Sequence, residues 1–366
     1  MGSDRWVLDP SSRRVALDVL RRGPISRAAL GRALGLSSGS LTRITKPMVA
    51  SGFLVQGAPV GAAAGRPSLP LDVDASAAHF VGVTIVVGRM YGVLTDLKGH
   101  VVGEATLDGD WRTSADAVAA IASLVARFSA AAPVQGIGVT LGAAVDGDGS
   151  VRGAEFLGWP TTPLATFIAE RTGIPATAEN DVNAYAVAEH WFGTGRGCSE
   201  FAVLTIGAGV GLGLVCNDQL VVGHHGAAGM IGFARLPDGR EARGVVESAA
   251  IARRVSAVLE RPVAYGQIAA LAQTDARVAA VLDDVADAVG QLAGLVALVT
   301  SPERLLISGD GVALIADRRH RVRSVFGRLS LAYVTPPSLH LAEVGFREWA
   351  RGAAAVAIRR HMAPLD

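Results

Sequence analysis

The sequence predicts an α/β protein with a small helical module at its N-terminus and a larger body of two related α/β lobes. Three observations support this fold class. Two short helix patterns joined by a glycine turn lie within the first 50 residues. A strand-rich segment begins near residue 79, and its pattern returns 121 residues later. A repeat of that length predicts a duplicated domain and not a solenoid of short units.

The N-terminal module is expected to contain three helices. The first contains RRVALDVLRRG and ends at Gly23. The second has Ser26 as its N-cap and Gly35 as its stop, because serine caps helix N-termini and glycine adopts the left-handed conformation that ends them. The third, SSGSLTRITKPMVASG, starts with Ser37 or Ser38 as N-cap. Two short helices joined by a tight turn with glycine are typical of a helix-turn-helix.

The third helix carries a polar row opposite its apolar stripe. This row is small, hydroxylated and basic, which suits a helix that lies in the major groove of DNA beside phosphates. An interior proline kinks a helix, so we expect Pro47 to lie late in it, beyond the contacting turns. The predicted DNA contacts on this helix are Ser37, Ser38, Ser40, Thr42, Arg43 and Lys46.

A predicted hairpin follows the three helices. FLVQG and LPLDVD read as strands around a loop rich in glycine and alanine, which would form the wing of a winged helix-turn-helix. Arg66, at the tip of this wing, is a further candidate contact with a minor groove or a phosphate. Residues 1–75 are therefore assigned to a winged helix-turn-helix DNA-binding domain. The alternative is a small helical bundle used for dimerisation.

The distribution of charge favours the DNA-binding assignment. Residues 1–74 contain ten Lys and Arg against five Asp and Glu, whereas the whole chain of 366 residues has a net charge of only +1. A basic module on a nearly neutral body is typical of a protein with a polyanionic partner.

The cysteine content and the hydropathy pattern predict the cellular compartment. The two cysteines, Cys198 and Cys216, are too few for a disulfide framework and suit a reducing cytosol. No apolar stretch reaches membrane length, and the first residues lack a hydrophobic signal core. We expect a cytoplasmic protein that does not interact with membranes.

The body is expected to contain one α/β pattern twice. FVGVTIVVGRMYGVLTDLKGHVVGEATLD predicts a hairpin and a third strand, with turns near Gly88 and Gly99. FAVLTIGAGVGLGLVCNDQLVVG repeats this shape, so that Phe80, Thr84, Gly88 and Gly92 map onto positions 121 residues later. A long helix is predicted over 275–299, before the strand RLLISG.

Two such lobes meeting at a cleft are typical of the actin-like and sugar-kinase-like (ribonuclease H-like) fold. Ligands in this two-lobed body are expected between the lobes. We assign the first lobe to residues 76–186, completed by a C-terminal helix over 345–366. The second lobe, with dimerisation helices, is assigned to residues 187–344.

Seven motifs, in order, resemble the ROK family (repressors, open reading frames, kinases), and in particular its winged-helix transcriptional regulators. They span nearly the whole chain. The motifs are LSSGSLTRITKPMVASGFL, GRPSLPLDVD, GVLTDLKGHVV, FLGWPTTPLA, ENDVNAYAVAEHWFG, LTIGAGVGLGLV and ISGDG. The resemblance implies a DNA-binding regulator whose body is built like a sugar kinase.

The first hairpin departs from the pattern of the family's kinases. Those kinases carry Asp-x-Gly-Gly-Thr, in which the aspartate helps to hold magnesium and the glycines admit ATP phosphates. Thr84 stands at the aspartate position here, and Val86 and Val87 stand at the glycine positions. No carboxylate is left to help hold Mg²⁺, and two valine side chains fill space that phosphates need. We therefore expect no enzyme activity and no ATP.

The second hairpin, LTIGAGVGLGLV, keeps its glycines. This loop is either half of a phosphate clamp or an inherited hairpin whose glycines serve packing and turn geometry. We favour the second interpretation, because its partner hairpin lacks both the aspartate and the two glycines.

Three polar residues remain where the family contacts sugar. By resemblance, Asn180 would hold a sugar hydroxyl, and Asp181 stands at the position of the catalytic aspartate, which accepts a proton in a kinase. Glu247 matches a further glutamate that contacts sugar. Adjacent amide and carboxylate groups can also bind vicinal hydroxyls without catalysis. An alternative role for Asp181 is to cap the helix that begins near Val182.

The remaining family motifs are lost. Met230 and Phe233 replace a glutamate and a histidine, so the pocket becomes apolar on that side, which favours a different ligand, a weaker one or none. PDGREARGVVE contains no cysteine, with Val245 at the last ligand position. A zinc site cannot be built from these residues, and we expect neither a metal nor a cofactor.

The function predicted from the sequence is that of a DNA-binding transcriptional regulator, a repressor, whose kinase-like body is expected to sense a carbohydrate. A homodimer or a dimer of dimers would bind a palindromic operator. A ligand that closes the lobes would shift the spacing of the recognition helices, provided that its affinities for the two conformations differ. Two alternatives remain: an ATP-dependent ROK sugar kinase with an added DNA-binding arm, and a ligand-independent DNA-binding scaffold with a vestigial cleft.

Overall fold

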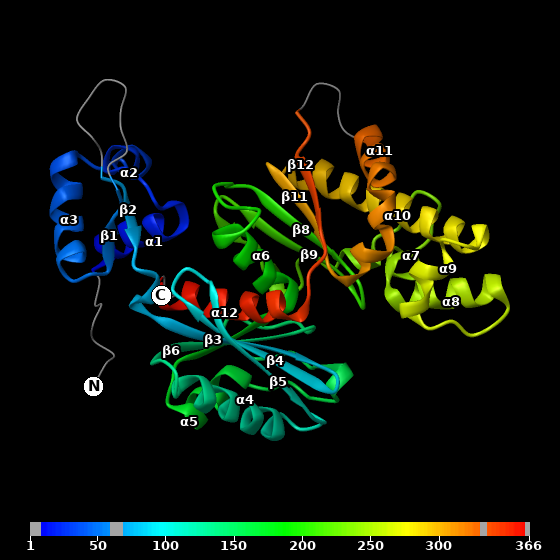
Figure 1. Ribbon diagram of the computed structural model, residues 1–366, viewed down its shortest axis with the longest axis horizontal. Coiled ribbons are helices and arrows are strands. Elements are labelled where there is room, and N and C mark those ends of the chain that lie inside the picture. Colours follow the sequence, from blue (N-terminus) through cyan, green and yellow to red (C-terminus); the bar gives the residue numbers. More distant parts are fainter. Residues whose placement is uncertain (1–8, 59–68, 330–334, 363–366) are drawn as a thin grey trace. The chain divides into compact units, whose positions relative to one another are not determined.

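The computed structural model describes residues 9–58, 69–329 and 335–362 of the chain. The chain divides into two compact units, and Figure 1 labels the elements of both. The first unit contains Met1–Ala184, Trp191–Gly197 and Ala350–Asp366, and the second contains Tyr185–His190 and Cys198–Trp349. The N-terminal module and the first sheet of the body thus belong to one unit.

Three helices and a two-stranded antiparallel sheet form the N-terminal module. Their bounds are α1 Pro10–Arg22, α2 Arg27–Leu34, α3 Ser38–Ala50, β1 Leu54–Gln56 and β2 Leu71–Val73. The Ser26 hydroxyl caps α2 by accepting a hydrogen bond from the Ala29 amide at 3.1 Å, and Gly35 ends α2 with a φ of 66°. These elements are those expected for a winged helix-turn-helix.

The module has its own apolar core. Helix α1 packs against α2, α3 and β2. The core side chains recur every three or four residues along the helices, as one buried helix face requires. The most fully buried are Val15, Val19, Leu20, Leu30, Leu41, Leu54 and Leu71. Residues 59–68, which include Arg66, lie outside the described residues.

The first sheet of the body has the order β5-β4-β3-β6-β7. Its strands are β3 His79–Val86, β4 Arg89–Asp96, β5 Val101–Asp108, β6 Val134–Leu141 and β7 Ala176–Asn180. Strands β5, β4 and β3 pair antiparallel, whereas β3, β6 and β7 are parallel. Helices α4 Ser114–Ser129 and α5 Leu164–Thr172 lie on one side of this sheet, and α12 Phe346–Met362 lies on the other (Figure 1).

The second sheet repeats this topology. Its order is β10-β9-β8-β11-β12, with β8 antiparallel to β9 and parallel to β11. The strands are β8 Phe201–Ile206, β9 Val210–Cys216, β10 Gln219–Leu220, β11 Arg304–Ser308 and β12 Ser338–Ala342. The helices of this unit are α7 Arg243–Val246, α8 Ser248–Leu259, α9 Ile268–Leu271, α10 Ala276–Thr300 and α11 Arg319–Leu329. Two sheets of the same strand order confirm the predicted duplication.

The two hairpins differ by one residue, which corrects the predicted one-to-one mapping. In the first, Val86 pairs with Arg89 across a two-residue turn. In the second, Ile206 pairs with Val210 across three residues. The counterpart of Ile206 at the shift of 121 is Ile85, which pairs with Met90 across four residues. The shift of 121 therefore holds along β3 and β8 but is off by one along β9, because the second hairpin is one residue shorter.

Helix α12 lies directly on the first sheet, where two glycines face it. A side chain at Gly82 would lie 2.0 Å from the carbonyl oxygen of Ala350, and one at Gly138 would lie 1.8 Å from that of Ala353. Such distances leave no room for even a methyl group.

Among the described helices, none is both long and apolar enough to cross a membrane.

Candidate functional site

The third helix of the N-terminal module presents its polar row to solvent. Thr42, Arg43 and Lys46 are exposed on α3, while Leu41 and Met48 are buried on its other face. Arg43 and Lys46 are three residues apart, so their side chains leave the helix on one side. The arrangement offers two adjacent cations to a phosphate backbone or to base edges.

The serines at the start of α3 have a structural role as well. Ser37, not Ser38, is the N-cap: its hydroxyl accepts a hydrogen bond from the Ser40 amide at 3.2 Å and donates one to the Ser40 hydroxyl at 3.0 Å. Ser38 is exposed. Pro47 lies near the end of α3, as expected, and is exposed.

Asn180 and Asp181 lie where two parallel strands of the first sheet end. Asn180 is the last residue of β7 and pairs with Leu141, the last residue of β6. Ligands of open α/β sheets bind at the carboxyl ends of parallel strands. The predicted sugar contacts of the first unit therefore occupy a position typical of ligand binding.

The structure corrects the helix cap predicted here. Helix α6, Asp181–Phe192, begins at Asp181, and its cap is Asn180, whose side-chain oxygen accepts a hydrogen bond from the Asn183 amide at 3.2 Å. The side-chain nitrogen of Asn180, Nδ2, donates a hydrogen bond to the carbonyl oxygen of Ala143 at 3.2 Å. Asn180 has a better capping geometry than Asp181 because it precedes the first helical residue by one position. Both polar atoms of the Asn180 side chain thus have hydrogen-bond partners within the protein.

Asp181 keeps one carboxylate oxygen available. Oδ1 accepts a hydrogen bond from the Val182 amide at 2.8 Å, while Oδ2 lies 3.6 Å from where a Cβ atom of Gly142 would be. Burial raises the pKa of Asp181 above its ordinary value. This carboxylate is the group of the pair best placed to accept a hydrogen bond from a ligand hydroxyl.

A neighbouring carboxylate, which the sequence analysis did not single out, holds this corner in place. Glu179 Oε1 accepts hydrogen bonds from the Asn180 amide at 3.0 Å and from the Asn183 side chain at 3.1 Å. Desolvation raises the pKa of Glu179, and the charge of Arg359 on α12 opposes that rise. The signal that could have identified Glu179 is that it is the one charged residue of the strand Ala176–Asn180, because a buried charge needs partners.

Glu247 belongs to the second unit and lies at the junction of α7 and α8. Burial raises its pKa, and Arg243 and Arg253 lower it in part. The next residue, Ser248, donates its amide hydrogen bond to the Gly207 carbonyl at 2.8 Å. Glu247 is thus tied to the glycine loop between β8 and β9.

The residues that depart from the kinase pattern lie in the first hairpin. Thr84 is buried in β3, at 2% exposure, and pairs with Thr140 of β6. Val86 is half-buried, and Val87, in the turn, is 70% exposed. A hydrocarbon side chain stands in solvent there, and no carboxylate occupies position 84.

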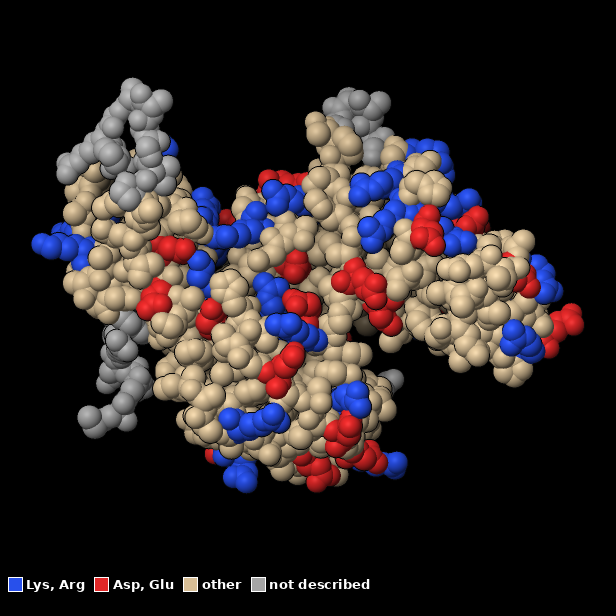
Figure 2. Space-filling view, in the orientation of Figure 1, with Lys and Arg blue, Asp and Glu red and all other residues tan. Residues whose placement is uncertain are grey.

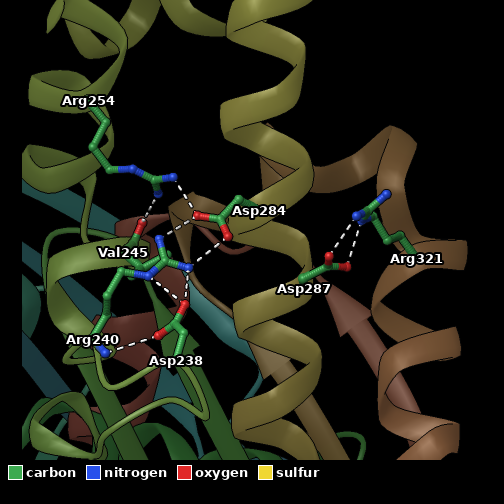
Figure 3. A network of polar contacts seen from close by, with 7 residues as sticks. All are labelled: Asp238, Arg240, Val245, Arg254, Asp284, Asp287 and Arg321. Carbon is green, nitrogen blue, oxygen red and sulfur yellow. Dashed lines mark hydrogen bonds and ion pairs between the residues drawn. The ribbon is translucent and has the colours of Figure 1, made fainter. Parts of the chain in front are cut away.

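The segment that would carry zinc ligands is held by ion pairs instead (Figure 3). Arg240 binds both carboxylate oxygens of Asp284 on α10, at 2.7 and 2.8 Å, and also contacts Asp238. Arg254 of α8 joins Asp284 at 2.5 Å and donates to the Val245 carbonyl. Among the described residues, no cluster of three or more histidine, cysteine, aspartate or glutamate side chains could hold a metal ion.

This network predicts a stability that depends on pH. The pKa of Asp284 is lowered, chiefly by its hydrogen bonds with Arg240. A pKa that is lower in the folded chain stabilises the fold above the ordinary carboxyl range, and that contribution is lost as the pH falls below about 4. Because the pair is partly exposed, Asp284→Asn should cost only about 1 kcal/mol at pH 7.

Chemical unfolding at pH 7 and pH 3 measures this contribution. The difference in unfolding free energy between wild type and Asp284→Asn should be clear at pH 7 and should shrink at pH 3. The control is Asp317→Asn, which removes an exposed carboxylate from the same unit. An Asp284→Asn difference that is equal at both pH values would show that its charge does not stabilise this segment.

The region around Met230 and Phe233 is apolar and open. Met230 is 60% exposed and Phe233 is 54% exposed. The guanidinium of Arg243 lies over the Phe233 ring, 4.2 Å from its centre. A cation and an aromatic ring stand here, in place of the two polar groups of the family's sugar site.

The arginines of α11 gather on one surface, which Figure 2 shows beside acidic side chains. Helix α10 supplies carboxylates to two arginines here. Arg321 of α11 binds both oxygens of Asp287 at 2.6 Å (Figure 3). Arg318, in the segment that precedes α11, contacts Asp283 at 2.7 Å. This pairing favours a solvated helix face over a second nucleic-acid patch.

The segment after α6 contacts the N-terminal module. Arg196 donates hydrogen bonds to the carbonyl oxygens of Arg21, at 2.8 Å, and of Gly23. These carbonyls lie at the C-terminal end of α1, where a cation is favoured. A second link joins Lys98, in the turn after β4, to Asp72 of β2 at 2.7 Å.

Comparison with known proteins finds regulators that are similar in sequence, and regulators and kinases that are similar in fold. A sequence profile of the ROK family matches residues 80–360. A putative xylose repressor of Caldicellulosiruptor sp. (strain Rt8B.4) is 25% identical over 64% of this chain and 61% of its own length. The DNA-binding transcriptional dual regulator NagC of Escherichia coli (strain K12) is 25% identical over 58% of this chain and 54% of its own length. The chain thus matches about three fifths of the length of these relatives.

Solved structures extend the comparison to the fold. A ROK family transcriptional regulator, homologous to the E. coli MLC protein, superposes with a TM-score of 0.78 over 96% of both chains, at 22% identity. A ROK family glucokinase from Streptomyces griseus, in complex with glucose and AMPPNP, has a TM-score of 0.65 over 76% of this chain and 99% of its own, at 24% identity. The regulator is matched over nearly its whole length, including the region of the N-terminal module. Because the family profile matches more than half of its residues, the chain belongs to the ROK family.

Proposed function

We propose that the protein is a DNA-binding transcriptional repressor whose ROK body responds to a carbohydrate. The observation that carries this proposal is the exposed Arg43–Lys46 face of α3, in a winged module that precedes the ROK body. The names of the relatives support it, because they are repressors of xylose and N-acetylglucosamine systems.

In the proposed complex, α3 enters the major groove and the exposed row reads DNA. Arg43 and Lys46 neutralise phosphates or contact base edges, and Ser38 and Thr42 add hydroxyl contacts. Arg66 remains a predicted contact of the wing. A homodimer, or a dimer of dimers, would place two such helices on an inverted repeat.

On the effector side, the Asp181 carboxylate would accept hydrogen bonds from sugar hydroxyls beside Asn180. Glu247 remains a predicted sugar contact of the second unit. The side-chain amide of Asn180 already forms hydrogen bonds with the Asn183 amide, as the helix cap, and with the Ala143 carbonyl. We infer that Asp181 contributes more to sugar affinity than Asn180 does.

Helix α6 provides a route from the effector residues to the DNA-binding module. It begins at Asp181 and continues to Phe192, and the following segment places Arg196 on the carbonyls that end α1. A sugar that moves the start of this helix would move α1 with it, provided that it binds the two conformations with different affinities.

A kinase function has less support from these residues. Position 84 offers no carboxylate for magnesium, and Val86 and Val87 replace the glycines of the phosphate motif. We therefore propose that ATP, magnesium and zinc are not cofactors. Consumption of ATP that depends on a hexose, and that Asp181→Asn abolishes, would support the kinase alternative instead.

A thermal-shift titration with D-xylose, N-acetylglucosamine and their phosphates tests the effector proposal. A sugar present at 100 times its dissociation constant should stabilise the protein by about 2.7 kcal/mol. Asp181→Ala should remove this shift but leave DNA binding intact. The control Asp110→Ala removes an exposed carboxylate of the first unit and should change neither property. No stabilisation by any sugar at millimolar concentration would favour the vestigial cleft.

The same sugar tests the route through α6. Arg196→Ala should bind the sugar as tightly as wild type, while the change in DNA affinity that the sugar causes should become smaller. A sugar effect on DNA affinity that is unchanged in Arg196→Ala would contradict this route.

A further inference from the structure

The glycine loop between β8 and β9 is filled from within its own unit. Gly207, Ala208 and Gly209 form this loop. A Cβ atom added at Gly207 would lie 1.8 Å from Oδ1 of Asp310 and 3.0 Å from its Cγ. The carboxylate of Asp310 therefore lies directly against the backbone of the loop, although 103 positions separate the two residues in sequence.

Backbone amides favour the charged form of this carboxylate. The amides of Asp310 itself, of Gly311 and of Ala208 lower the pKa of the carboxyl group, and one of them belongs to the glycine loop. Successive backbone amides can form an anion-binding nest. The anion that lies at this loop is a side chain of the protein.

The segment that carries Asp310 is shaped to reach the loop. Gly309 has a φ of 106°, and a Cβ atom there would lie 2.2 Å from the carbonyl oxygen of Ile206. A Cβ atom at Gly311 would lie 2.9 Å from the same oxygen. Only glycine permits this approach, so the backbone on both sides of Asp310 is pressed against the end of β8.

We propose that Asp310 is an internal anion that occupies the second glycine loop and excludes phosphate groups from it. The excluded ligands are nucleoside triphosphates, nucleoside diphosphates and inorganic phosphate. Exclusion has two causes: the carboxylate already fills the space beside Gly207, and a fixed negative charge repels a second anion. This inference rests on the proposed function and explains how a loop that keeps its glycines belongs to a protein that does not use ATP.

The electrostatic setting of Asp310 agrees with this role. Burial raises the pKa of its carboxyl group, and the charge of Glu343 raises it further, whereas the backbone amides of Asp310, Gly311 and Ala208 lower it. A phosphate at this loop would have to displace an anion that is covalently part of the chain.

Isothermal titration of the full chain with inorganic phosphate, and separately with MgATP, tests the proposal. The variants are Asp310→Gly, which frees the nest, and Asp310→Asn, which keeps the shape of the side chain but removes its charge. The control is Asp317→Asn, in the same segment, Asp310–Arg318, but exposed. We expect Asp310→Gly to bind phosphate at least about tenfold more tightly than wild type. Asp310→Asn should fall between them, and the control should match wild type.

Two results would overturn the proposal: phosphate or MgATP binding by wild type that is as tight as binding by Asp310→Gly, or no gain in either variant. If Asp310→Gly does not fold, as its thermal unfolding would reveal, the Asp310→Asn titration decides. Failure of the proposed function has a different signature, since it would appear as hexose phosphorylation by the wild-type protein. An inert wild type whose variants gain nothing contradicts only the role of Asp310.

Discussion

Gly138→Ala is expected to lower the free energy of unfolding by about 3 kcal/mol, at the upper end of the range for overpacked cores. The added methyl group would lie 1.8 Å from the carbonyl oxygen of Ala353 and 2.6 Å from its carbonyl carbon. Both are backbone atoms of α12, so no side-chain rotation can relieve the clash. The helix would have to move away from β6, and the apolar contacts of its alanine face would be lost with it.

Urea unfolding followed by circular dichroism measures this loss. Gly147→Ala is the matched control, because a methyl group there meets no atom within 4 Å. The control should stay within about 0.5 kcal/mol of wild type. Equal stability of the two variants would contradict the close packing of α12 on the first sheet.

Arg43→Ala/Lys46→Ala is expected to abolish most of the affinity for operator DNA. Each phosphate contact that is lost lowers the slope of log affinity against log salt by about 0.9, so the slope should fall by up to about 1.8. If Arg43 reads a base, its loss also relaxes specificity at one position, by about 1–3 kcal/mol. The two cations lie on the exposed face of α3, and therefore their removal should leave the fold intact.

Fluorescence anisotropy with a labelled operator duplex at several salt concentrations measures both effects. Arg112→Ala/Arg127→Ala is the charge-matched control, since both arginines are exposed in the first lobe outside the winged module. Specific binding by the α3 double variant that equals wild type at physiological salt would show that another element reads the operator.

The local features of this fold could be predicted from the sequence because neighbouring residues determine them. Ser26 begins α2 and Gly35 ends it through contacts that span at most four positions. The glycine turns at Gly88 and Gly99, both with positive φ, separate the strands of the first sheet. The duplication was visible because both copies keep the same spacing of phenylalanine and threonine along β3 and β8.

The features that the sequence did not predict depend on distant or finely balanced contacts. The second hairpin is one residue shorter than the first, which changes its register, and a fixed shift of 121 cannot show this. Whether Asn180 or Asp181 caps α6 depends on a difference of one position in where the helix starts. The contact of Asp310 with Gly207, and that of Gly138 with Ala353, join residues more than 100 positions apart.

The central claim is that this ROK protein reads specific DNA, and selection of genomic fragments from a library tests it most directly. We predict that the full-length protein enriches a small set of fragments that share an inverted repeat. It should bind them at least about a thousandfold more tightly than scrambled duplexes of the same length at physiological salt. Enrichment no greater than that of scrambled DNA, together with ATP consumption that depends on a hexose, would contradict the account.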